Sequence, residues 1–179
     1  MMLITSNEKK IEEFKAALGE IEVRQVEYSE IKAAEPCDVA KSAAKQLAEE
    51  LNEVVIVEDS GLFIDALKDF PGTNTHFSDE RIGNVGLLKL MEGVKERQCE
   101  YRSAIGYCEP GKEPLCFLGV EQGKIAEKMR GSKGWGQDSL FIPQGSEQTY
   151  GEKREVGDVN VFRHRAIEKL KAYLLSLQK

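Results

Sequence analysis

The sequence lacks the features that would mark a membrane, secreted or repeat protein. It contains no apolar run of transmembrane length, no amino-terminal signal pattern and no internal repeat. Its four cysteines lack CxxC spacing, so we expect four reduced thiols, with a Cys108–Cys116 pair across a hairpin as the lesser alternative. A GxxxxGK(S/T) loop is also missing, which argues against a P-loop nucleotidase. We therefore expect a soluble, cytoplasmic protein.

Positive charge is also scarce. Lys and Arg number 25 against 31 Asp and Glu, for a net charge of −6, and no long basic stretch offsets this balance. The deficit argues against broad nucleic-acid binding, and an anionic substrate would need local lysines, local arginines and a divalent cation. The 179 residues, 41% of them hydrophobic, can bury one full core. We therefore predict a single domain over residues 1–179.

Hydrophobic periodicity predicts strands and helices that alternate early in the chain, with paired strands in its middle. Four helical faces are predicted, formed by Ile11, Phe14 and Leu18; by Val39, Ala43, Leu47 and Leu51; by Leu87, Leu88 and Met91; and by Ile167, Leu170, Leu174 and Leu177. Strands are predicted over residues 3–4, 21–26, 54–57, 101–107 and 115–120, with a hairpin turn at residues 109–112. A mixed sheet with helical flanks is the predicted architecture.

Two adjacent carboxylates follow the most apolar of these strands. The β-branched run Val54–Val57 leads directly into Glu58 and Asp59, and then into Ser60 and Gly61. In open α/β sheets, ligands bind at the carboxyl ends of strands. The pattern favours a site for metal and phosphate, whereas the simpler alternative is a polar turn.

A second candidate segment lies at the amino terminus. A short strand breaks into Thr5-Ser6-Asn7, and the helix that follows has Ser6 or Asn7 as a natural N-cap. The free N–H groups of a helix start attract an anion. Lys10 falls within the first turn, where a cation is unfavourable unless something negative docks there. This segment therefore predicts a phosphate-binding turn.

Two later segments suggest recognition of a base. Glycines surround Trp135, the only tryptophan, and Asp138 follows closely. Such a loop lets the backbone approach a flat ligand and leaves the indole exposed, although a lone tryptophan is more often part of a core. Residues 162–165, Phe-Arg-His-Arg, open the last helix, where cations oppose the helix dipole. They suggest an anionic or nucleobase ligand, with a solvated basic turn as the alternative.

The order and spacing of these segments resemble one family, the non-canonical purine nucleoside triphosphate pyrophosphatases, also called inosine triphosphatases or XTP/dITP diphosphatases. The resemblance runs over essentially the whole chain. It is carried by Thr5-x-Asn7-x-x-Lys10, Glu58-Asp59-Ser60-Gly61-Leu62, Phe70-Pro71-Gly72, Gly134-x-Gly136-x-Asp138 and His164-Arg165. It implies an elongated mixed sheet flanked by helices around a central substrate cleft, usually in a homodimer. The implied reaction is Mg²⁺-dependent hydrolysis of ITP, dITP and XTP to monophosphate and pyrophosphate.

The resemblance also implies roles for individual residues. Asp59 matches the catalytic acid, and Glu30 is the best match to a second metal ligand. Thr5, Asn7, Lys10, Lys45, Ser60 and Gly61 would contact the phosphates, and Lys10 would act in catalysis. The implied contacts with the purine are Trp135, Gly136, Asp138, His164 and Arg165.

This chain departs from the family pattern near its carboxyl terminus. Arg163 stands where a serine usually precedes the His-Arg pair, and a lysine common a few residues upstream is missing from residues 156–161. We interpret Arg163 as a replacement for that charge. Two alternatives stay open. One is a pyrophosphatase acting on modified pyrimidine nucleotides, which shares the general fold, and the other is a nucleotide-binding protein without turnover, which the altered motif suggests.

Overall fold

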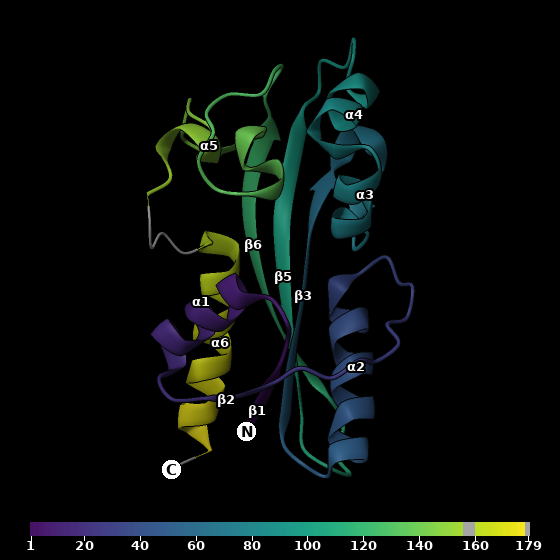
Figure 1. Ribbon diagram of the computed structural model, residues 1–179, viewed down its shortest axis with the longest axis vertical. Helices are drawn as coiled ribbons and strands as arrows, with labels where there is room; N and C mark the ends of the chain where they lie inside the picture. Colours follow the sequence, from purple (N-terminus) through teal and green to yellow (C-terminus); the bar gives the residue numbers. More distant parts are fainter. Residues whose placement is uncertain (156–159, 178–179) are drawn as a thin grey trace. The chain divides into compact units, whose positions relative to one another are not determined.

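Helices and strands follow one another in the order in which the sequence predicts them (Figure 1). The computed structural model describes residues 1–155 and 160–177. The elements are β1 (Met2–Ile4), α1 (Glu8–Leu18), β2 (Glu22–Arg24), α2 (Pro36–Leu51), β3 (Val55–Ile64), η1 (Asp65–Leu67), β4 (Pro71–Gly72), α3 (Thr75–Arg81), α4 (Gly83–Leu90), β5 (Gln98–Cys108), β6 (Leu115–Ile125), η2 (Gly136–Ser139), β7 (Phe141–Pro143), α5 (Tyr150–Lys153) and α6 (Val161–Ser176). None of the described helices is long and apolar enough to cross a membrane.

The strands form a mixed sheet, as predicted, and it contains seven strands, two of which, β4 and β7, were not predicted. Its order is β2-β1-β3-β5-β6-β7, with β4 paired to β3. Strand β1 runs parallel to both β2 and β3, whereas the β3–β4 and β6–β7 pairs are antiparallel. The parallel part follows from the helical connections early in the chain, and the antiparallel part from the later turns.

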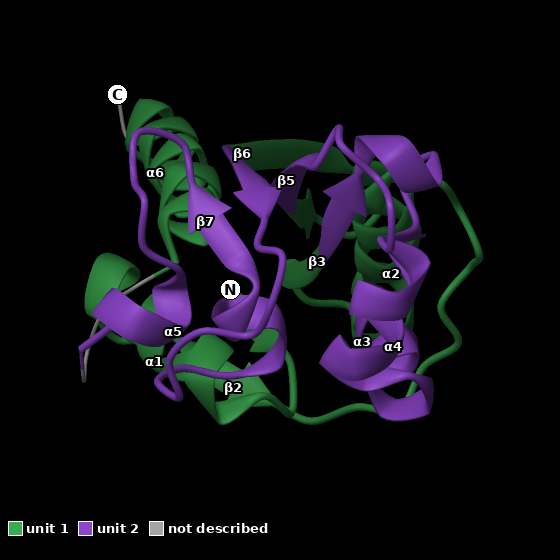
Figure 2. Ribbon diagram, turned by 90° about the horizontal axis from the view of Figure 1, so that it is seen from above, with its two compact units in different colours: residues 1–60, 103–120, 159–179 green, residues 61–102, 121–158 purple. Residues whose placement is uncertain are grey.

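The chain forms two compact units (Figure 2). Unit 1 comprises residues 1–60, 103–120 and 159–179, and unit 2 comprises residues 61–102 and 121–158. Strands β3, β5 and β6 contribute residues to both units.

Unit 1 is a sheet with helices on both faces (Figure 1). Successive side chains of a strand point to opposite faces of the sheet, and here the side chains on both faces are apolar. Met2, Ile4, Val55 and Val57 pack with Ala43, Ala44, Leu47 and Ala48 of α2. Leu3 and Ile56 pack on the other face with Phe14 of α1 and with Ala166, Ile167 and Leu170 of α6. Glycines allow this close packing, since a Cβ on Gly106 would lie 2.1 Å from Ala40 O and one on Gly119 2.0 Å from Phe162 O.

Unit 2 packs around aromatic residues and one arginine. The Phe141 ring lies 4.7 Å from the ring of Tyr101 and 5.5 Å from that of Tyr150. The Arg97 guanidinium donates to four backbone carbonyls, those of Met91, Val94, Ile125 and Ala126. Because these acceptors belong to two separate segments, Arg97 joins the end of α4 to the end of β6.

Several boundaries differ from the prediction. Strand β3 does not end before the carboxylates but continues to Ile64, where it pairs with β4. Strand β2 covers only Glu22–Arg24, and β6 extends to Ile125. Leu177, predicted to be buried, is 54% exposed because α6 ends at Ser176. The segment 156–161, where the family's lysine is missing, is only partly described, because residues 156–159 lie outside the described part of the chain.

The expectation of four reduced thiols is wrong, as is the Cys108–Cys116 alternative. Cys37 at the start of α2 forms a disulfide with Cys116 at the start of β6, whereas Cys99 and Cys108 are free and buried. The Cys37 and Cys116 Cα atoms lie 5.7 Å apart, although 79 positions separate them in the sequence. Only the packing of α2 on the sheet brings these two cysteines together.

Reduction of this disulfide should lower the stability of the protein. Closing a loop of 79 residues restricts the unfolded chain, and the chain-entropy estimate is about 4 kcal/mol. We expect dithiothreitol to lower the melting temperature of the wild type but not that of a Cys37→Ser/Cys116→Ser variant. Thiol titration of the unfolded, unreduced protein should find the thiols of Cys99 and Cys108 alone. Four titratable thiols would contradict the assignment.

Candidate functional site

The amino terminus of α1 is held by the predicted cap, which is Asn7 rather than Ser6. Asn7 Oδ1 accepts hydrogen bonds from the backbone N–H groups of Lys9 at 3.0 Å and Lys10 at 3.2 Å. Thr5 Oγ1 accepts from Asn7 N at 3.2 Å. Both side chains therefore shape the turn between β1 and α1. This turn carries Lys10 into its position beside β3.

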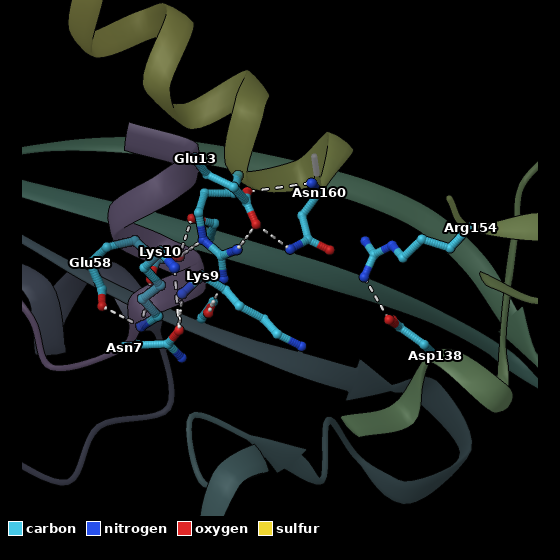
Figure 3. A network of polar contacts seen from close by, with 11 residues as sticks. Asn7, Lys9, Lys10, Glu13, Glu58, Asp138, Arg154 and Asn160 are labelled. Atoms are coloured by element: carbon cyan, nitrogen blue, oxygen red, sulfur yellow. Dashed lines mark hydrogen bonds and ion pairs between the residues drawn. The ribbon is translucent and has the colours of Figure 1, made fainter. Parts of the chain in front are cut away.

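Lys10 already has a negative partner within the chain (Figure 3). Its Nζ lies 2.6 Å from Glu58 Oε2 and donates to the backbone oxygen of Glu58 at 3.0 Å. This contact explains how a lysine is accommodated in the first turn of a helix. A lysine ammonium has three protons. These two acceptors account for two of them.

Glu58 is a buried carboxylate held by three side chains. Besides Lys10, Arg163 Nε donates to its Oε1 at 3.0 Å and Ser103 Oγ donates to the same oxygen at 2.5 Å. Burial alone would raise the pKa of Glu58, but the charges of Arg163 and Lys10 outweigh it and hold this pKa well below its usual range. Glu58 is therefore ionised near neutral pH.

Arg163 connects α6 to α1 and β3. Its side chain is fully buried, and its Nη1 donates to Glu13 Oε1 at 2.8 Å. Its Nη2 donates to Ser60 Oγ at 3.3 Å, and Asn160 Nδ2 donates to Glu13 Oε1 at 2.7 Å. Figure 3 shows Glu13 beside Asn160. The Arg163 guanidinium thus contacts two buried carboxylates, those of Glu13 and Glu58.

Asp59 lies on the other face of β3 from Glu58, since successive strand side chains alternate. Its Oδ2 is buried and has no hydrogen-bond partner among residues 1–155 and 160–177. Burial first, and then the charges of Glu58 and Glu30, raise the pKa of Asp59 to about 7. The exposed Glu30 accepts a hydrogen bond from Tyr28 Oη at 3.1 Å.

The carboxylates of Asp59 and Glu30 fit a hard divalent cation. The unpartnered Asp59 oxygen is the type of ligand that Mg²⁺ prefers, and Mg²⁺ commonly takes only one or two protein carboxylates while keeping several waters. The described residues contain no group of three or more His, Cys, Asp or Glu side chains placed to hold a metal. The site therefore fits a cation shared with a ligand or water.

The position of Glu58 and Asp59 within the sheet corrects the predicted one. Both residues lie inside β3 rather than at its end. The strand that ends is the neighbouring β1, whose last residue, Ile4, pairs with Val57. In the sheet, Glu58 and Asp59 therefore lie just beyond the carboxyl end of the neighbouring strand β1, where the chain turns into α1.

Three predicted phosphate or base contacts lie elsewhere in unit 1. Lys45 Nζ contacts Glu113 Oε1 at 2.9 Å on the exposed side of α2. His164 and Arg165 are exposed on α6, and Arg165 Nη1 donates to Val120 O at 2.5 Å. The structure therefore brings Arg163, and not these three side chains, to the carboxylates of β3.

Gly61, another predicted phosphate contact, is required by packing in unit 2. A Cβ at this position would lie 2.0 Å from Gly72 O. Thr75 Oγ1 accepts from Leu62 N at 2.8 Å and donates to Gly72 O at 2.7 Å. The Pro71-Gly72 motif and the Ser60-Gly61 motif thus meet as two backbone segments.

The predicted base-binding loop of unit 2 is a tight turn. Trp135 N donates to Asp138 Oδ2 at 3.0 Å, and Asp138 N donates to Trp135 O at 3.1 Å. Gly134 and Gly136 have φ angles of +76° and +56°, which favour glycine. Trp135 is 39% exposed, whereas Asp138 is buried. The tryptophan is therefore not a core residue.

The sequence analysis did not assign roles to several of the residues that hold these segments. They are Glu13, Ser103, Asn160 and Arg154. None belongs to a local motif, because each acts on a residue at least 16 positions away. The only sequence signal was the unusual Arg163, which we interpreted as a replacement charge.

Comparison with known proteins identifies the family of this chain. The profile of the Ham1 family matches residues 1–173. The chain belongs to the Ham1 family. A relative in Methanosarcina acetivorans named dITP/XTP pyrophosphatase is 38% identical over 98% of this chain and 97% of its own. One of the same name in Methanopyrus kandleri is 42% identical over 85% of this chain and 83% of its own. The solved structure of the Staphylococcus aureus Ham1 protein matches with a TM-score of 0.82, 26% identity and 98% coverage of both chains.

Proposed function

We propose that this Ham1-family protein is a nucleotide-pool sanitising pyrophosphatase that hydrolyses ITP, dITP and XTP to the monophosphate and pyrophosphate. The observation that carries the proposal is the Asp59 carboxylate, which has a buried oxygen without a hydrogen-bond partner among the described residues and a pKa raised to about 7. A general base works best when its pKa lies near the working pH. The names of the relatives supply the substrate class.

In this proposal, Asp59 orients or deprotonates the water that attacks the α-phosphorus. Lys10 places its third ammonium proton on a phosphate oxygen, and the α1 turn with Thr5 and Asn7 faces the same anion. Ser60 lies next to Asp59 and contacts Arg163, so we propose that it and Gly61 line the phosphate path. Lys45 stays a predicted phosphate contact that requires its pair with Glu113 to open.

We propose Asp59 and Glu30 as the ligands of a Mg²⁺ ion. A divalent cation at this position would neutralise phosphate charge and lower the pKa of a bound water. Glu58, ionised and held by Arg163, adds the negative charge that favours a cation nearby. In this proposal Asp59 binds the cation, and the adjacent Glu58 contributes negative charge near it.

For the base, we propose stacking on Trp135 beside Gly136 and Asp138, with His164 and Arg165 as further contacts. Trp135 supports the first part because its ring is exposed on a fixed turn. Selectivity against adenine would come from polar groups left unpaired by its amino group. Assembly as a homodimer and location in the cytoplasm stay predictions.

The proposal is tested by pyrophosphate release with Mg²⁺ from ITP, XTP, dITP, ATP, GTP, UTP and a modified pyrimidine triphosphate. We expect turnover of the first three and little of the others. Preference for the modified pyrimidine would instead support the alternative specificity. Binding of ITP without release from any substrate would identify a nucleotide-binding protein.

Cation binding in the absence of nucleotide should depend on pH. A proton and a cation compete for Asp59, so affinity should fall about tenfold for each pH unit below about 7. Calorimetric titration with Mn²⁺ or Mg²⁺ between pH 5.5 and 8 measures this slope. The Asp59→Asn variant should bind weakly at every pH, and a wild-type affinity that does not change with pH would contradict the assignment.

A further inference from the structure

Arg154 of unit 2 forms a buried ion pair that no motif predicts (Figure 3). Its Nη1 lies 2.5 Å from Asp138 Oδ2, and the two side chains are only 7% and 6% exposed. Removing two opposite charges from water is costly unless the geometry of the pair is good. A buried pair beside an exposed tryptophan loop therefore calls for a specific role.

Residues of α5 and β6 hold the Arg154 guanidinium. It lies 4.8 Å above the Tyr150 ring, and Tyr150 Oη donates to Glu121, with its two carboxylate oxygens at 2.5 and 2.6 Å. The start of α5 is closed by Thr149, whose Oγ1 accepts from Glu152 N at 3.2 Å. Because these contacts restrain Tyr150, the position of Arg154 is defined before any ligand binds.

The same Asp138 oxygen that accepts from Arg154 also accepts from the Trp135 backbone. A Cβ on Gly134 would lie 2.0 Å from this oxygen, so the chain passes very close to it. The ion pair therefore fixes the carboxylate that closes the turn. This turn carries the exposed Trp135.

Two further contacts hold the other end of the loop to α3 and α4. Asn84 Nδ2 donates to Gly136 O at 2.9 Å, and Gln137 Nε2 donates to Asp79 Oδ1 at 3.0 Å. These contacts anchor η2, and Lys133 N donates to Gly151 O at 3.0 Å on the other side of Trp135. Within this frame, the Asp138 carboxylate is a side chain that holds the Trp135 backbone, and Arg154 holds that carboxylate.

We propose that Arg154 is a positioning residue for purine binding, which holds the Asp138 carboxylate in place so that Trp135 is pre-organised for stacking. The inference rests on the proposed function. Loss of the guanidinium removes the charged partner of a buried carboxylate, and the turn that this carboxylate closes must rearrange. Ligand binding then has to order the loop, which raises KM while the chemistry on the phosphates is unchanged.

The single tryptophan allows a direct test that needs no turnover. IMP is titrated into the wild type, Arg154→Met and Lys153→Met while tryptophan emission is recorded. Lys153 is the matched control because it is the adjacent cation, is exposed, and contacts the same Tyr150 ring at 5.4 Å. We expect Arg154→Met to bind IMP about tenfold more weakly, to show a shifted emission maximum, and to have a KM for ITP raised tenfold with kcat within about twofold.

Equal IMP affinity in Arg154→Met and the wild type would overturn the proposal, as would a wild-type tryptophan that does not respond to IMP. If Arg154→Met does not fold, Arg154→Lys retains the charge without the planar fork. That variant should lose several-fold in affinity, and full affinity would equally overturn the proposal. Failure of the proposed function is separate, since a wild type that binds IMP but releases no pyrophosphate from ITP refutes only the hydrolase.

Discussion

Replacement of Asp59 by asparagine should lower pyrophosphate release from ITP by about 10³-fold, because it removes both a proton acceptor and a cation ligand. The substitution alters the carboxylate whose Oδ2 is buried and has no hydrogen-bond partner in the part of the chain that the structure describes. Steady-state kinetics with saturating Mg²⁺ measure the effect. Asp38→Asn, an exposed acid in the first turn of α2, is the control and should keep wild-type activity.

The same variant should be more stable than the wild type at high pH in the absence of metal. The pKa of Asp59 is raised by folding, so its ionised form destabilises the protein as pH rises from about 4 through about 7. Asparagine carries no charge and escapes this cost. The melting temperature of Asp59→Asn should exceed that of the wild type at pH 8, exceed it by less at pH 5, and approach it below about pH 4. An inactive variant with lower stability at pH 8 would show that Asp59 is a structural residue.

The second large effect is expected at Arg163, where Arg163→Met should cost about 3–5 kcal/mol of unfolding free energy. The substitution leaves Glu13 and Glu58 buried with one cation fewer. Arg165→Met is the matched control, because Arg165 is exposed on the same helix, two residues away. Urea denaturation at pH 7 compares the two, and equal stability would refute the role assigned to Arg163.

The pH dependence of this loss separates charge from packing. In the wild type the pKa of Glu58 is lowered, so the stability it contributes is present above its unfolded pKa and is lost as pH falls through the lower folded value. Without Arg163 that pKa rises, and protonation of Glu58 relieves the unpaired charge. The difference between wild type and Arg163→Met should therefore shrink between pH 7 and pH 4. A difference that does not change with pH would indicate lost packing alone.

Local patterns were sufficient for most of the secondary structure. Asn7 caps α1 because a side-chain oxygen there reaches the next free N–H groups, which depends only on neighbouring residues. The alternation of Val55, Ile56 and Val57 between two helical layers follows from strand geometry. The turn after β5 forms because Gly111 accepts a φ of +73°.

The choice between neighbouring arginines needed the tertiary structure. Arg163 and Arg165 differ by two positions, which turns a helical side chain by about 200°. Which of the two faces the sheet depends on where α6 begins and how it packs, and the basic run at residues 162–165 carries no signal for this. The fully buried Arg163 and the exposed Arg165 are the outcome of that packing.

The sequence by itself determined the order of elements, the apolar faces and the segments that carry chemistry, because these depend on residues close together in the chain. Only the tertiary structure decided the partner of Lys10, the disulfide of Cys37 and the opposite pKa shifts of Glu58 and Asp59. Adjacent carboxylates in one strand differ in acidity because alternation sends them to different faces. Glu58 meets the cations Lys10 and Arg163, whereas Asp59 meets burial and like charge. These energies depend on distances through space.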